Sequence, residues 1–335
     1  MTKPNANKEL KLSNNLGIDI DKRKLDYSFG QGLHHGSEPN DAEGHARLIA
    51  LCRLRPGVRV ICEATGGYEK KLVKALRKEG IEVHVVMPLK VKYLAIAAGQ
   101  MSKTDPIDAG KLALYGEKIE LKKHRVASEH DEKLRELVEC RKHLVEQRVR
   151  LAGKRENAGE RMLRLLDAEQ AEIERLEQQI EKETEECIAA NAESREKVER
   201  MIQVKGVGRK VAAGVLAYMP ELGMISDKTA SALAGLAPYA DQSGLVEKPR
   251  HIRGGRRELR QVLFPAAMVA MRCNPILKTF NQRLKDKGKP GKVRVTAVMR
   301  KLICLLNRLC AEVIKGQTKG MEETAKPPRR ACPAQ

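Results

Sequence analysis

Short apolar runs alternate with helical patterns through residues 15–125 of this 335-residue chain. A helix is predicted over Tyr68–Glu79, because Leu72, Val73 and Leu76 share one of its faces and Gly80 supplies a stop. Three apolar runs bounded by Gly or Pro predict strands at Leu16–Ile20, Val58–Glu63 and Ile81–Met87. This succession predicts an α/β domain over residues 15–128.

The pattern changes between residues 130 and 200, which hold no proline and abundant Glu, Arg and Lys. Apolar residues recur there at the a and d spacings of a heptad, interrupted by Glu169 and Glu183. These residues are Met162, Leu166, Ile173, Leu176, Ile180 and Cys187. The spacing predicts a long helical hairpin or coiled coil over 129–198 that separates two domains or pairs two protomers.

The remaining segments complete the predicted organisation. Residues 199–315 are typical of short helices and Gly-rich turns, which predicts a mainly helical C-terminal domain. Residues 1–14 are polar and residues 316–335 are rich in Lys, Arg and Pro, so both ends are expected to be disordered. No secretory signal is visible, and no apolar run approaches the ~20 residues that span a membrane. We therefore expect a cytoplasmic protein.

Charge narrows the class of partner. Lys and Arg number 64 against 44 Asp and Glu, which gives a net charge of +20. Residues 241–300 hold 15 basic and 4 acidic residues, whereas residues 161–200 hold 7 and 12. Such a concentration favours a polyanionic partner bound by the C-terminal part. With no Trp and three Phe, stacking on bases is a minor binding mode, and the eight Cys form no C-x-x-C pair typical of a zinc site.

Two carboxylates lie inside or at the end of predicted strands. Asp19 is part of Leu-Gly-Ile-Asp-Ile, and Glu63 ends Val-Arg-Val-Ile-Cys-Glu before Ala-Thr-Gly-Gly. A buried acid is costly unless it is hydrogen-bonded or binds a metal. Acids at the ends of adjacent strands suit Mg²⁺ (or Mn²⁺), which prefers oxygen ligands. Either residue alone also fits an exposed or turn-capping carboxylate. Asp21 is a second acid near the first strand, but the apolar run surrounds Asp19.

A second acidic pair lies in Lys-Thr-Asp105-Pro-Ile-Asp108-Ala. Proline favours the first turn of a helix, so Asp105 is a natural N-cap and Asp108 occupies the third helical position. This spacing fits simple capping. It also presents both carboxylates on one side of the helix start, where they are able to close a metal site with Asp19 and Glu63.

Two C-terminal motifs favour contacts with phosphate. Val-Lys205-Gly206-Val-Gly208-Arg-Lys210 joins two helical patterns like a helix-hairpin-helix, in which glycines let the backbone approach a phosphate. A plain turn is the alternative. Further on, Ser243 precedes a glycine in a segment expected to be an irregular loop, where Ser-Gly also fits a simple turn. Four arginines suited to phosphate contacts follow: Arg253, Arg256, Arg257 and Arg260.

Taken in order along residues 15–315, these motifs resemble the DEDD transposases of the insertion sequence 110 family, relatives of the Piv DNA invertases. The resemblance rests on Gly-Ile-Asp19, Glu63-Ala-Thr-Gly-Gly-Tyr, Lys-Thr-Asp105-Pro-Ile-Asp108-Ala, Val-x-Gly-Val-Gly, and Gly-Leu-Ala-Pro…Ser243-Gly…Arg-Gly-Gly.

The resemblance implies a RuvC-like, ribonuclease-H-type N-terminal domain, a coiled-coil connector and a C-terminal transposase domain. It implies that Asp19, Glu63, Asp105 and Asp108 bind metal and that Ser243 attacks a DNA phosphate to form a phosphoserine link. It further implies donor and target DNA, a structured non-coding guide RNA, association with the nucleoid, and a dimer or tetramer assembled through the coiled coil. The residues themselves also leave open a junction-resolving nuclease that hydrolyses with water, or a non-catalytic nucleic-acid-binding protein.

Overall fold

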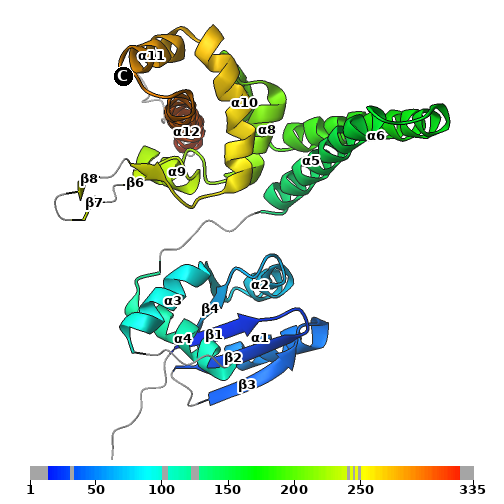
Figure 1. Ribbon diagram of the computed structural model, residues 1–335. Helices are drawn as coiled ribbons and strands as arrows, with labels where there is room; N and C mark the ends of the chain where they lie inside the picture. Colours follow the sequence, from blue (N-terminus) through cyan, green and yellow to red (C-terminus); the bar gives the residue numbers. More distant parts are fainter. Residues whose placement is uncertain are drawn as a thin grey trace, which may run out of the picture. The chain divides into compact units, whose positions relative to one another are not determined.

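The structure, a computed structural model, describes residues 14–30, 34–99, 105–121, 128–239, 242–243, 246–247 and 250–324. The chain forms two compact units, residues 1–125 and 126–335, and each is treated by itself (Figure 1). Across these described ranges, no helix has the length and apolar character needed to cross a bilayer.

A five-stranded mixed sheet in the order β3-β2-β1-β4-β5 forms the centre of the N-terminal unit. β1, β2 and β3 are antiparallel neighbours, whereas β4 and β5 run parallel to β1. The strands are β1 (Asn15–Ile20), β2 (Lys24–Phe29), β3 (His34–Pro39), β4 (Arg59–Glu63) and β5 (Glu82–Val86). The helices are α1 (Ala42–Arg53), α2 (Glu69–Lys78), α3 (Pro88–Ala97) and α4 (Asp105–Lys118).

Helices cover both faces of this sheet. Successive strand residues point to opposite sides, so the strands present apolar side chains on both faces and each face packs against helices. Leu16 and Ile18 of β1 are fully buried in a core shared with α1 and α2. On the opposite face, Ile61 of β4 packs with Leu112 and Tyr115 of α4. The second face is the one that carries the acidic residues described below.

The three predicted strands and the predicted helix are confirmed as β1, β4, β5 and α2. The helix buries the three apolar residues assigned to its face, and Gly80 follows its end with φ 73°. The pattern missed β2, β3, α1 and α3. β2 reads Lys-Leu-Asp-Tyr-Ser-Phe, and such polar alternation gives no continuous apolar run.

The C-terminal unit is mainly helical, as predicted. Its helices are α5 (Glu129–Arg155), α6 (Glu160–Ala189), α7 (Ala192–Ile202), α8 (Arg209–Tyr218), α9 (Asp227–Leu233), α10 (Arg257–Cys273), α11 (Pro275–Asp286) and α12 (Gly291–Thr324). Two short antiparallel pairs join β6 (Pro238–Tyr239) to β9 (His251–Ile252), and β7 (Gln242–Ser243) to β8 (Val246–Glu247).

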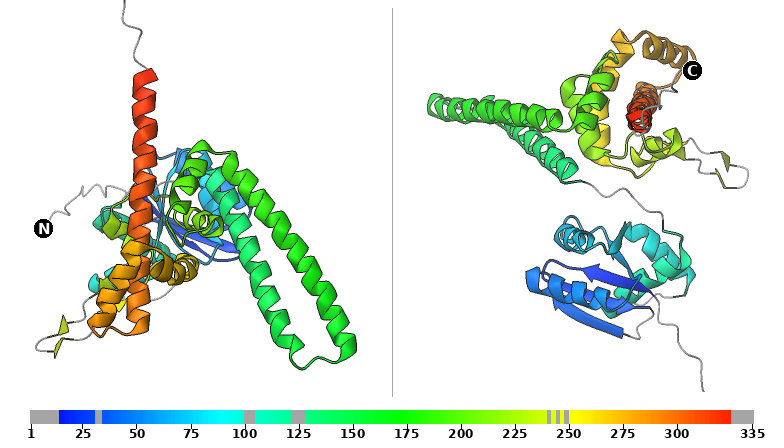
Figure 2. Two further views of the ribbon diagram at one scale, coloured as in Figure 1. Left: turned by 90° about the horizontal axis from the view of Figure 1, so that it is seen from above. Right: turned by 180° about the vertical axis from the view of Figure 1, so that it is seen from behind.

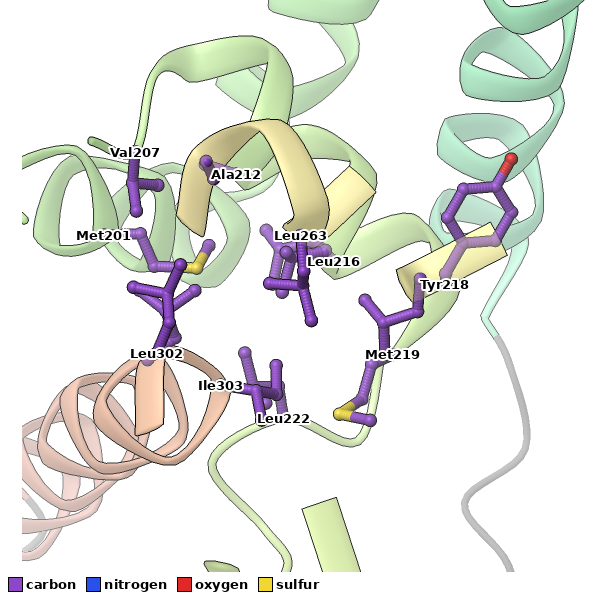
Figure 3. Packing of buried hydrophobic residues seen from close by; sticks show 14 of the residues in the cluster. Met201, Val207, Ala212, Leu216, Tyr218, Met219, Leu222, Leu263, Leu302 and Ile303 are labelled. Atoms are coloured by element: carbon purple, nitrogen blue, oxygen red, sulfur yellow. The ribbon is translucent and has the colours of Figure 1, made fainter. Parts of the chain in front are cut away.

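α8 lies at the centre of this unit and is buried over its last seven residues. Figure 3 shows Leu216 of α8 against Leu263 of α10, and Met201 of α7 beside Leu302 of α12. The base of α5 and α6 contributes to the same core through residues such as Leu134. The segment predicted as a separate connector therefore packs as one body with the C-terminal helices.

α5 and α6 form a long antiparallel hairpin whose two helices lie side by side (Figure 2). The sequence prediction had the seam partly out of phase. Leu166, Ile173 and Cys187 are buried as expected, but Met162 is 51% exposed. Leu176 and Glu183, which the heptad spacing places in the seam, are only partly buried. The residue after each of them, Glu177 and Thr184, is buried instead. Polar residues in the true seam hid its register from a pattern based on hydrophobicity.

α12 continues to Thr324, past the boundary at 315 where a disordered tail was predicted. The first proline after that boundary is Pro327, so nothing in the residues up to Thr324 forbids a helix. Residues 325–335 and 1–13, also predicted to be disordered, lie outside the described residues.

Candidate active site and nucleic-acid interface

Asp19 and Glu63 lie on neighbouring parallel strands at the same level of the sheet. Ile18 pairs with Cys62, and each acid is the next residue on its strand. Both acids are partly buried. Parallel strands present their carboxyl ends at one edge, so these two side chains share an edge and a face, as the sequence predicted.

α4 brings Asp108 over the same face. The helix lies close to β1 because Gly17 has no side chain: a Cβ there would overlap the carbonyl oxygen of Ala109 and the amide of Ala113. Asp108 is partly buried and accepts a hydrogen bond from the Lys111 ammonium at 2.7 Å. Asp105 begins the helix, but its side chain lies outside the described part of the structure.

The three described carboxylates interact electrostatically. Burial raises the pKa of Glu63 above its usual value of 4.5, and the charges of Asp19 and Asp108 raise it further, while Lys111 opposes them. Where side chains are described, no three Asp, Glu, His or Cys converge closely enough to form a ready metal cluster. Asp19, Glu63 and Asp108 therefore form one negatively charged group, called the carboxylate locus below. Asp105, the fourth predicted ligand, is the first residue of α4, the helix that carries Asp108.

Two acids near this locus escaped the sequence analysis. Glu69 fixes the turn after Glu63: its Oε2 accepts from the Thr65 amide at 3.2 Å, the Thr65 hydroxyl at 3.0 Å and the Gly67 amide at 2.9 Å. Asp26 of β2 is the register partner of Asp19, which places both on the same face, and it pairs with Lys24 at 3.0 Å. The sequence held a signal for each of them: Glu69 comes two residues after a Gly-Gly pair, and Asp26 alternates with apolar residues.

Asp21, the other acid near β1, lies in the turn to β2. It is exposed and accepts a hydrogen bond from the Arg23 amide at 3.1 Å. This turn-capping contact supports the choice of Asp19 for the site.

Ser243 was expected in an irregular loop, and the structure places it instead at the end of β7. It pairs with Val246 of β8 in an antiparallel ribbon that projects from the helices of the unit (Figures 1 and 2). Tyr239 of β6 pairs with His251 of β9 in a separate two-stranded sheet, and these strands flank β7 and β8 in the sequence; the two pairs together are called the Ser243 ribbon below. Backbone pairing of this kind leaves little trace in residue type. The Ser243 side chain lies outside the described part of the structure.

Two of the four predicted phosphate-binding arginines bond within the protein, and one of them, Arg260, does so on either side of the β6–β9 pair. Arg260 donates to the Gly254 carbonyl at 2.6 Å and the Ala234 carbonyl at 3.3 Å. Arg256 donates to the Tyr218 carbonyl at 2.8 Å and pairs with Glu221 at 2.7 Å. Both are thus engaged within the protein.

The other two arginines, Arg253 and Arg257, are exposed. They are the members of the group whose accessibility fits contact with an external polyanion.

The glycine motif forms the turn between α7 and α8. Gly206 has φ 105° and packs against Ala270 of α10, so it is explained by conformation and close packing. Gly208 is exposed with open space around it and precedes the N-terminus of α8. Lys205 is exposed, but Lys210 forms an ion pair with Glu181 of α6. The motif therefore serves packing at one glycine and leaves the other accessible.

Comparison with known proteins gives this architecture a family. A transposase family of the DEDD type matches residues 16–158, and the transposase family IS116/IS110/IS902 matches residues 198–282. This chain belongs to the IS110 family of transposases. It is accordingly a DNA transposase or recombinase, acting on DNA, and members of this DEDD family typically use a divalent metal ion.

Two similar proteins match most of the chain, and a third matches a shorter part of it. The chain is 28% identical to the pilin gene-inverting proteins of Moraxella lacunata and Moraxella bovis over 300 residues, which are 87% of this chain and 93% of each relative. A 43.6 kDa protein of insertion element IS110 from Streptomyces coelicolor is 31% identical over 110 residues, or 32% of this chain and 27% of that protein.

Proposed function

We propose that this transposase cuts and rejoins DNA by transferring a strand to Ser243, with a divalent metal ion (Mg²⁺ or Mn²⁺) that Asp19, Glu63, Asp105 and Asp108 would hold. The observation that carries this proposal is the placement of Asp19 and Glu63 side by side at the ends of adjacent strands, on the face that α4 covers with Asp108. Burial, and then the charges of Asp19 and Asp108, raise the pKa of Glu63, which is consistent with that placement. Such a locus of hard oxygen ligands suits a divalent cation. The position of the acids on a mixed sheet covered by α4 supports a RuvC-like, ribonuclease-H-type fold for this unit.

The acids and the serine have separate tasks in the proposed reaction. A bound divalent ion would stabilise charge that develops on the scissile phosphate. The Ser243 hydroxyl oxygen attacks phosphorus, the phosphorus–oxygen bond to the neighbouring nucleotide breaks, and the departing DNA oxygen takes up a proton as the serine loses one. A DNA hydroxyl then attacks the phosphoserine, so rejoining needs no nucleotide cofactor.

The C-terminal unit is proposed to hold the nucleic acid. Arg253 and Arg257 are assigned to phosphate contacts because they are exposed. Arg260 is assigned to the support of the Ser243 ribbon, and Arg256 to the packing at the end of α8. Lys205 and the amides beyond Gly208 are assigned to backbone phosphates, with Lys210 and Gly206 shaping that turn.

The further partners follow from the family resemblance. They are a structured guide RNA and a second copy of the chain joined through the α5–α6 hairpin. The net charge of +20 suits a polyanionic partner of either kind, DNA or RNA, so the guide RNA rests on the resemblance alone. Release of a discrete RNA from the purified protein, abolished by prior ribonuclease treatment, is the expected result.

Trapping the covalent intermediate tests the proposal directly. Full-length protein is incubated with labelled donor DNA and Mg²⁺ and then denatured, and the adduct is located by digestion and mass spectrometry. We expect the label on Ser243, no adduct from Ser243→Ala, and a normal amount from Ser37→Ala, an exposed serine of β3 used as the matched control. Free cleaved ends at an undiminished rate from Ser243→Ala would instead assign the protein to the nucleases that use water.

A further inference from the structure

Lys111 lies within the carboxylate locus, and neither the sequence motifs nor the proposed reaction accounts for it. Lys111 is one turn beyond Asp108 on α4, and its Nζ lies 2.7 Å from Asp108 Oδ1. Its side chain is only 12% exposed. Lys111 also acts on Glu63, whose pKa it lowers against the effect of the neighbouring acids.

A nearly buried ammonium differs from the ion pairs found on helix surfaces. Arg175 and Glu172 have the same i,i+3 spacing, yet their side chains are 63% and 54% exposed. Exposed pairs of that kind contribute little, whereas removing one partner of a buried pair leaves a charge that is costly to bury alone. The charge of Lys111 therefore affects the stability of the carboxylate locus much more than the charge of an exposed lysine would.

The effect of Lys111 follows from the charges around it. Asp19 and Asp108 repel Glu63, and the positive charge of Lys111, bonded to Asp108, relieves part of that repulsion. A divalent ion binding the same carboxylates would repel the ammonium, because like charges at such separations interact strongly in a partly buried site. Lysine suits this exchange, since its flexible stem lets the ammonium move without displacing the helix.

We propose that Lys111 is the internal counter-cation of the carboxylate site, holding Asp108 in place before the metal binds and leaving that carboxylate when the metal arrives. This inference rests on the metal site proposed above. Lys111 is thus a positioning residue that stabilises the metal-free protein and lowers its affinity for divalent ions. Whether the site holds a metal ion then depends on competition between that ion and the Lys111 ammonium for the Asp108 carboxylate.

Metal binding measured without DNA separates this role from a merely structural one. Mn²⁺ is titrated calorimetrically into the full-length protein and into Lys111→Met, Lys111→Gln and Lys118→Met. Lys118 lies at the exposed end of the same helix and serves as the matched control. We expect both Lys111 variants to bind Mn²⁺ about tenfold more tightly than the wild type, as expected when a competing charge is removed. Lys118→Met should bind like the wild type.

Thermal unfolding gives the second readout. The Lys111 variants should unfold at a lower temperature than the wild type in EDTA and recover that difference when Mn²⁺ saturates the site. If Lys111→Met fails to fold without metal, the milder Lys111→Gln supplies the affinity. Unchanged or weaker Mn²⁺ binding in these variants would overturn the role of Lys111 alone. Failure of the wild type to bind Mn²⁺ any better than Asp19→Asn would overturn the metal site itself.

Discussion

The acidic residues of the N-terminal unit and the serine of the C-terminal unit are held by their own units in opposite ways. Asp19, Glu63 and Asp108 stand on two central strands and a helix that touches the sheet through Gly17. Ser243 stands on the two-residue strand β7, which pairs with β8, and Arg260 bonds to carbonyls on either side of the separate β6–β9 pair. The acids are fixed by packing over a whole face, whereas the serine depends on a few backbone hydrogen bonds. We infer that the acidic site is preorganised and that the ribbon adapts to the DNA.

The largest expected effect tests the acidic site by charge alone. Glu63→Gln should reduce strand cleavage by at least about 100-fold, as the loss of a central electrostatic group does in other enzymes. It should also stabilise the metal-free protein at neutral pH, because the pKa of Glu63 is raised by burial and by Asp19 and Asp108. Cleavage with Mg²⁺ and chemical denaturation in EDTA measure the two effects.

The pH dependence of this stabilisation has a definite sign. The protonated form of Glu63 is favoured in the folded protein, so the stability it provides is present below the usual pKa of 4.5 and is lost as pH rises through the raised folded value. The gap between Glu63→Gln and the wild type should therefore be larger at pH 7 than at pH 4.5. A gap of the same size at both values would show that Glu63 is not strained by its neighbours.

The next effect tests whether packing positions the acids. Gly17→Ala should cost about 1–3 kcal/mol or more, since its methyl group would overlap the backbone of α4 and force that helix away. Because α4 carries Asp108, cleavage should fall as well. Gly153→Ala in α5 is the control, as open space surrounds that position and the helix carries no residue assigned to metal or phosphate. Equal unfolding free energies for Gly17→Ala and the wild type would contradict the inference that close packing of α4 fixes the acidic site.

A smaller effect tests the support of the ribbon. Arg260→Gln removes the bonds to the Gly254 and Ala234 carbonyls, so formation of the Ser243 adduct should fall by about 10- to 100-fold through misplacement. DNA affinity and its dependence on salt should remain as in the wild type. A weaker salt dependence in Arg260→Gln would return that residue to the phosphate contacts.

The smallest effect comes from an exposed arginine of the same cluster. Arg257→Gln should lower the slope of log affinity against log salt by about 0.9 for the one phosphate it is proposed to contact. At saturating DNA the adduct should form at the wild-type rate. Filter binding across a salt series measures the slope, and a slope equal to that of the wild type would remove Arg257 from the interface.

Part of this arrangement was predictable from the sequence. Short apolar runs gave β1, β4 and β5, because strands buried on both sides require continuous hydrophobicity. The acids Asp19 and Glu63 were visible for the same reason, as charges that interrupt such runs. The shared face of Leu72, Val73 and Leu76 gave α2, because a helix buried on one side repeats its apolar residues every three or four positions. The glycines between α7 and α8 marked a turn through backbone freedom, and the uneven charge marked the basic unit.

Only the tertiary structure decided the remainder. The partnership of Asp26 with Asp19 depends on strand register, and the burial of Lys111 depends on the closeness of α4 to the sheet. The assignment of Arg260 to the ribbon depends on carbonyls about six and twenty-six residues away along the chain. A residue's type determines what it is able to bind, but its partners are set by the distances that folding creates between segments remote in sequence.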